Sequence, residues 1–128
     1  MTPIADPLTT RQTVIMLALG VVLWFLAALL MRALAPFGWL TPRDAPLLYA
    51  LVVPGTVPFV LLARRVARLG NQRLLGGVAM ATAAATLCDG VALMWYRPLY
   101  GSDPLDAAAT ILWGAGVALV IAALLARR

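Results

Sequence analysis

Four apolar stretches make up most of this chain, and each is long enough to cross a lipid bilayer. They cover residues 13–35, 46–63, 74–96 and 105–126. A membrane-spanning helix needs about 20 mostly apolar residues. A hydrophobic fraction of 63% with 12% charged residues also exceeds what a soluble fold of this size can bury. The sequence therefore predicts an all-α membrane protein with four transmembrane helices.

The segments between the four stretches are short, which restricts how the helices can follow one another. Short connections favour neighbours that run in opposite directions, so we expect an up-down-up-down antiparallel bundle. Residues 1–128 then form one transmembrane domain that starts with a short irregular tail over residues 1–8. Residues 33–35 have the small-x-small form of a cleavage site, but the apolar run before them is too long for a signal peptide and Pro36 follows. We expect a retained first helix and a chain that begins near Met1.

Positive charge gathers on one side of the predicted bundle. The segment of residues 64–73 contains four arginines and no acid, and Arg11, Arg127 and Arg128 lie on the same side. The opposite side balances its arginines with aspartates, so the positive-inside rule places both termini in the cytoplasm. The net charge of +5 then reflects membrane orientation and not nucleic-acid binding. The residues expected to contact anionic lipid headgroups are Arg64, Arg65, Arg68 and Arg73.

The choice of charged residues is unusual and limits the possible chemistry. All basic residues are Arg and all acidic residues are Asp, which is typical of GC-rich bacterial genomes and suggests a bacterial inner-membrane protein. Without His, Glu or Lys the chain has few general bases, and its single Cys allows no disulfide and no zinc cluster. Phosphate-binding loops and nucleophile motifs are absent. We therefore expect no enzyme activity, no cofactor and no metal.

One carboxylate lies well inside the third apolar stretch, at Asp89. A charged side chain near the bilayer centre costs about 2.5–3.5 kcal/mol, so an aspartate there is a functional candidate. Gly77, Ala81 and Ala85 precede it at intervals of four and give this helix a small-residue face suited to close packing or binding. We therefore expect Asp89 to face a neighbouring helix and not lipid.

Several roles for Asp89 are open from the sequence alone. It could pair with Arg32 of the first helix as a structural lock, shuttle protons in a small transporter, or bind the polar group of a ligand within the bundle. Simple exposure to water is a further outcome. Arg32 lies near the end of its helix and could instead extend outward to the membrane surface.

The second apolar stretch contains Pro54 and Pro58. Each proline removes a backbone donor and clashes with the carbonyl four residues earlier, so we expect a kink or a break near mid-membrane. The freed carbonyls need neighbouring helices, Thr56 or water as partners, so this side is expected to face protein. A broken helix can mark a transporter binding site, although proline kinks that only shape packing are commoner.

The fourth stretch carries a second small-residue face, which we expect to receive the third helix. Tryptophans could also line a slot for a lipid or an isoprenoid, with Trp24 and Trp113 as the candidate binding residues and Trp95 beside them. The small-residue face of the fourth stretch is formed by Gly114, Ala118, Ala122 and Ala126, at intervals of four.

Three segments carry a resemblance to a known family. They are Gly20–Arg32 (GVVLWFLAALLMR), residues 87–90 (LCDG) running on to Trp95 and Tyr100, and residues 111–113 (ILW) followed by small residues. In this order they resemble a bacterial family of four-helix integral membrane proteins classed as a domain of unknown function. The resemblance implies a small polytopic membrane protein with an aspartate in its third helix, and it implies no activity.

The two small-residue faces and the lack of catalytic patterns favour a role through helix packing. The leading expectation is a non-enzymatic inner-membrane protein that acts as a homo-oligomer or as an accessory subunit of a larger membrane complex. One alternative is a small permease or proton-coupled carrier that uses Asp89, Arg32 and the interrupted second helix. The other alternative is a binding protein for a lipid or an isoprenoid.

Overall fold

The computed structural model describes residues 7–127, so most of the expected tail and Arg128 lie outside the described residues. This part of the chain contains long helices joined by short connections, and no strand. Each long helix is apolar enough to cross a membrane, which confirms the prediction of an all-helical chain with four candidate spans. The long helices are α1 (Thr10–Leu34), α2 (Ala45–Val66), α3 (Asn71–Trp95) and α4 (Pro104–Ala126), and the 3-10 helices are η1 (Ala35–Phe37) and η2 (Arg97–Tyr100).

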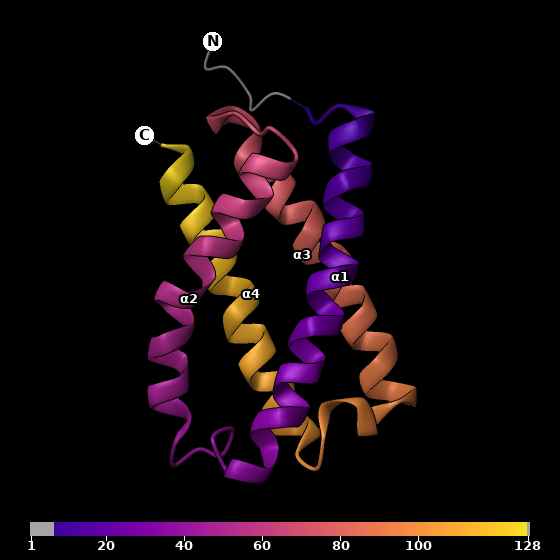
Figure 1. Cartoon of the computed structure of the whole chain (residues 1–128), viewed down its shortest axis with the longest axis vertical. Helices are drawn as coiled ribbons and strands as arrows, with labels where there is room; N and C mark the ends of the chain where they lie inside the picture. The colour runs from indigo at the N-terminus through magenta and orange to yellow at the C-terminus, as the bar shows by residue number, and fades with distance from the viewer. Residues whose placement is uncertain (1–6, 128) are drawn as a thin grey trace.

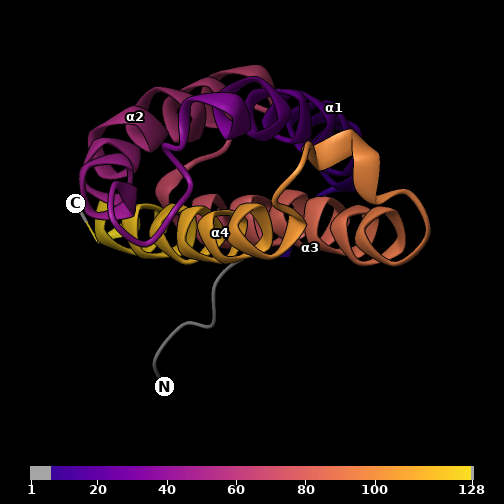
Figure 2. The ribbon, with the colours of Figure 1, turned by 90° about the horizontal axis from the view of Figure 1, so that it is seen from below.

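The four long helices form two layers (Figure 2). One layer contains α1 and α2 and the other contains α3 and α4, so that α1 packs on α3, α2 packs on α4, and α3 lies beside α4. The two members of the first layer make little contact with each other. In Figure 1 the start of α1, the α2–α3 connection and the end of α4 lie at the top, and the other two connections lie at the bottom.

Buried apolar side chains gather in two clusters. One cluster lies toward the start of α1 and includes Met16 and Leu74, both fully buried. The other lies toward the opposite end and includes Ala28, Tyr100 and Ala107. The two clusters lie toward opposite ends of the bundle, and members of both line the cavity described below.

A close approach between helices joins α1 to α3. A Cβ added to Gly20 would meet the carbonyl oxygen of Ala81 and would lie 2.9 Å from the Ala81 Cα. A Cβ added to Gly77 would lie 2.5 Å from Leu69 Cδ1, so this glycine is covered by the α2–α3 connection. Gly114 of α4 lies nearest to Val52 of α2, at 3.8 Å from an added Cβ, so at this position the second small-residue face looks toward α2 and not α3.

Two prolines bend α2 without breaking it. The helix is continuous from Ala45 to Val66, although Figure 1 shows that it changes direction about halfway along. Both Pro54 and Pro58 are exposed, so the expectation that they face protein within this chain is wrong. The Thr56 hydroxyl donates to the carbonyl of Val52 at 2.6 Å, which is not one of the carbonyls that the prolines leave without a backbone donor.

Candidate functional site

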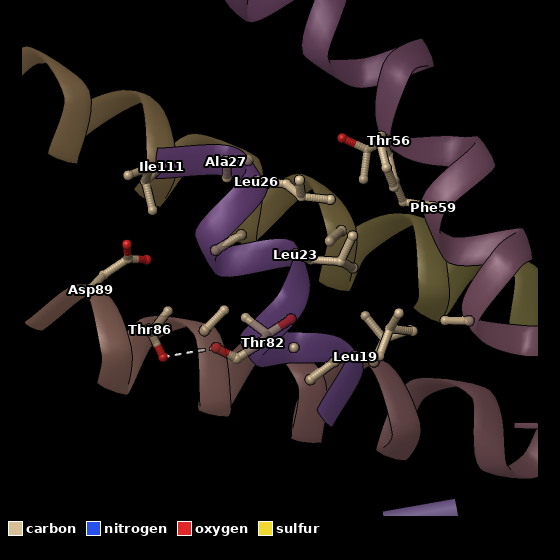
Figure 3. Close-up of a pocket in the computed structure, with 18 of the residues that line it drawn as sticks. Leu19, Leu23, Leu26, Ala27, Thr56, Phe59, Thr82, Thr86, Asp89 and Ile111 are labelled. Carbon is tan, nitrogen blue, oxygen red and sulfur yellow. Dashed lines mark hydrogen bonds between the residues drawn. The ribbon is translucent and has the colours of Figure 1, made fainter. Parts of the chain in front are cut away.

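A cavity of about 360 Å³ lies between all four long helices. Its volume is near the lower end of the range for small-molecule sites. Most of its lining is aliphatic, and Figure 3 shows leucines of α1, Phe59 of α2, Ile111 of α4 and the third helix around it. The polar side chains in the lining are Thr56, Thr82, Thr86, Asp89 and Thr110.

Asp89 is buried in the wall of this cavity, with 8% of its surface exposed. Its Oδ1 atom accepts a hydrogen bond of 2.6 Å from the Tyr100 hydroxyl. The same hydroxyl oxygen accepts a 3.0 Å hydrogen bond from Nε1 of Trp24, which is half-buried on α1. One chain of hydrogen bonds therefore joins α1, η2 and α3, and it points toward the carboxylate.

The η2 turn brings Tyr100 back into the bundle after α3 has ended. Tyr100 has no exposed surface, and burial together with its hydrogen bond to Asp89 raises the pKa of its hydroxyl. The turn ends at Gly101, whose φ of +89° lies in the left-handed region that favours glycine. A Cβ there would also lie 3.1 Å from the Ala35 Cβ and 3.3 Å from the Arg32 Cα. Glycine thus lets η2 pack closely against the end of α1.

Arg32 does not pair with Asp89. Its side chain is exposed, and no ion pair joins these two residues in the described part of the chain. The structural lock between them is therefore wrong, and the outward orientation is the correct alternative. A long arginine side chain near a helix end reaches the membrane surface at lower cost than it can enter an apolar interior.

Three of the four threonines in the cavity lining direct their protons away from it. Thr56 donates to Val52 O, and Thr110 donates to Asp106 O at 3.0 Å. Thr86 donates to Thr82 O at 2.9 Å, as the dashed line in Figure 3 shows. These three hydroxyl groups can therefore offer only oxygen lone pairs to a molecule in the cavity. Within residues 7–127 no three metal-binding side chains come together.

The tryptophans do not line a common slot. Trp24 bonds to Tyr100 and lies outside the cavity lining. Trp113 is exposed, stacks on Tyr49 with a ring distance of 5.2 Å, and donates to Tyr49 O at 3.0 Å. Trp95 is exposed at the end of α3. The expected tryptophan slot is therefore wrong, whereas Ala81 and Ala85 of the predicted small-residue face do line the cavity.

The cavity opens between α1 and α2. Among its lining residues, Leu26 and Leu30 of α1 and Phe59 of α2 are exposed on the outside of the bundle. These two helices make little contact with each other, and the exposed side chains at the rim are all apolar.

The arginine-rich connection is partly held by neutral polar groups. Arg64 Nη2 donates to Asn71 Oδ1 at 2.7 Å, and Arg73 Nη1 donates to Gln12 Oε1 at 3.3 Å. Gln12 also donates to Ala67 O at 3.4 Å and to the carbonyl of the next residue at 3.3 Å. Arg65 and Arg68 are exposed, so both remain available to lipid headgroups.

Sequence reasoning identified Asp89 and Thr56 but missed the role of Tyr100. Tyr100 lies outside the apolar stretches, so it reads as part of a surface turn. The available signal was a tyrosine shortly after an intramembrane acid, followed directly by a glycine.

Comparison with protein-family models, curated proteins and solved structures gave no match to this chain. The resemblance to a four-helix family of unknown function stays a prediction.

Proposed function

We propose that this protein binds a small amphiphilic molecule inside its helical bundle and acts as a small permease or carrier for it. The observation that supports this function is a carboxylate, oriented by a tyrosine, in the wall of a mostly apolar cavity. A buried carboxylate is costly, and close packing would normally fill such a space. Binding a ligand gives both features a common purpose.

The proposed setting is a bacterial inner membrane. The bundle is antiparallel, and the arginine-rich connection with both termini lies in the cytoplasm, as the positive-inside rule favours. Asp89 then lies nearer the outer side of the membrane than the cytoplasmic side. Its cavity opens toward lipid between α1 and α2, which gives a membrane-dissolved ligand a route of entry.

The first test fills the cavity. Ala85→Leu places three additional carbon atoms into the space, and Ala83→Leu makes the same change at an exposed position of the same helix. Native mass spectrometry of the protein, extracted in mild detergent, would detect a retained small molecule. We expect a bound mass in the wild type and in Ala83→Leu, and its loss in Ala85→Leu. Equal retention in both variants, or no bound mass in any form, would contradict the proposal.

A second candidate function is helix packing with another chain, as a homo-oligomer or as a subunit of a larger complex. The small-residue face of α3 does not support this function, because Gly20 of α1 already packs against Ala81 within the same chain. The exposed Pro54 and Pro58 do favour it, because each leaves a carbonyl without its backbone donor on the outside of α2. The same mass spectra give the subunit number. A strictly monomeric protein without partners would rule this function out.

A further inference from the structure

The polar groups around the cavity are almost all hydrogen-bond acceptors. Thr56, Thr86 and Thr110 donate their protons to carbonyls of their own helices. The Tyr100 proton goes to Asp89 Oδ1, and the Trp24 N–H goes to Tyr100. No arginine lies among the lining residues. Apart from the Thr82 hydroxyl, a ligand in this cavity therefore meets oxygen lone pairs and needs to supply donors of its own.

The second oxygen of the carboxylate is the acceptor best placed for a ligand. The Tyr100 hydroxyl donates to Oδ1 of Asp89 and leaves Oδ2 to other partners. No fully buried side-chain oxygen or nitrogen in this part of the chain lacks a partner, so Oδ2 has access to open space. Figure 3 shows the carboxyl group projecting from α3 on the side where Ile111 lies.

In the described part of the chain no opposite charge pairs with Asp89. A buried charge without an opposite charge nearby is strongly unfavourable in an apolar surrounding. No ion pair reaches Asp89 within residues 7–127, and a hydrogen bond from a neutral phenol cannot neutralise it. A cationic ligand would supply both the missing charge and the missing donor.

We infer that the ligand is a primary or secondary amine with a short apolar body, bound as an ammonium ion to Asp89 Oδ2. This inference rests on the proposed function and specifies its ligand. Quaternary ammonium groups are recognised by cages of several aromatic rings, whereas Phe59, at the rim, is the aromatic residue of this lining. An N–H donor on the cation fits the acceptor-rich wall, and the aliphatic lining fits a hydrocarbon body.

The test uses the full chain in nanodiscs of uncharged phosphatidylcholine, with four probes of equal chain length. These probes are octylamine, octanol, octanoate and octyltrimethylammonium. Binding is measured by calorimetry and corrected with empty nanodiscs, because all four probes also partition into lipid. We expect octylamine to bind at least about 10-fold more tightly than the other three, since a hydrogen bond to a charged group has that magnitude.

Variants of the protein test the contributions of the carboxylate and of the cavity to binding separately. Asp89→Asn keeps an oxygen for Tyr100 and removes the charge, so octylamine should then bind no better than octanol. Asp103→Asn is the matched control, because Asp103 lies outside the cavity and the substitution should leave octylamine affinity unchanged. Ala85→Leu should abolish the binding of every probe.

The outcomes distinguish this inference from the proposed function. Octanol binding as tight as octylamine binding, lost in Ala85→Leu but kept in Asp89→Asn, would overturn the amine ligand and keep the cavity as a binding site. No binding above empty nanodiscs for any probe would overturn both. Should Asp89→Asn fail to fold, the wild-type comparison of octylamine with octyltrimethylammonium decides, and equal affinities overturn the inference.

Discussion

The two sides of α1 differ sharply in how closely they are packed. On one side Gly20 lets α1 approach α3 until backbones touch, and Trp24 reaches the Tyr100–Asp89 pair. On the other side α1 and α2 make little contact, and the cavity opens between them. The difference indicates that α1 and α3 form the closely packed part of the bundle. The α1–α2 side is where the structure can admit a molecule.

The largest expected effect tests the closed side of α1. Gly20→Val would push a side chain into the Ala81 backbone, which has no room to move within a helix. We expect a loss of about 3 kcal/mol in the free energy of unfolding, at the upper end for overpacking. The measurement is unfolding in dodecyl maltoside followed by circular dichroism.

The matched control for this substitution is Gly116→Val on α4. Gly116 is exposed, and nothing lies within 4 Å of an added Cβ. Its unfolding free energy should stay within about 0.5 kcal/mol of the wild type. Similar losses in both variants would show that valine is simply unfavourable in these helices and that the closeness of α1 to α3 is not the cause.

An intermediate effect is expected at the hydrogen bonds across the same side. Tyr100→Phe removes the donor of Asp89 and the acceptor of Trp24 at a position with no exposed surface. Leaving buried polar groups unpaired costs about 1–3 kcal/mol, measured by the same unfolding experiment. Tyr96→Phe serves as control, since Tyr96 is 64% exposed. A stable Tyr100→Phe variant would show that the hydroxyl does not hold the carboxylate.

The smallest effect concerns the polar contact that joins α1 to the end of α2. Gln12→Ala removes the bonds to Ala67 O and to Arg73, and should lower stability by about 1 kcal/mol. Hydrogen exchange should rise at residues 67–70 and stay unchanged around Ala81. Gln72→Ala, at an exposed position, is the control. Faster exchange around Ala81 would mean that the two sides of α1 are not independent.

The four spans were predictable because membrane insertion requires long apolar segments, and the chain has few charges to interrupt them. How each helix is rotated was not predictable. Intervals of four identified the Gly77–Ala81–Ala85 face, yet they could not say which helix would cover it. The same limit explains why Pro54, expected to face protein, is exposed.

Asp89 was predictable as a candidate site residue because an acid inside an apolar span is rare and costly. Its partner was not, since charge complementarity favoured Arg32 over an uncharged phenol. The structure brings Tyr100 to Asp89 through a turn whose path depends on the left-handed backbone of Gly101. The cavity itself depends on the separation of α1 from α2, which no sequence interval reports.

The short separation between Asp89 and Tyr100 has a consequence for biosynthesis. Only 11 positions divide the acid from its donor, so at about 5–20 residues per second both leave the ribosome within roughly two seconds. The hydroxyl therefore follows the acid out of the ribosome within seconds, and it lies ahead of the fourth span in the chain. A nascent chain can thus insert its acidic segment without waiting for the complete protein to shelter it.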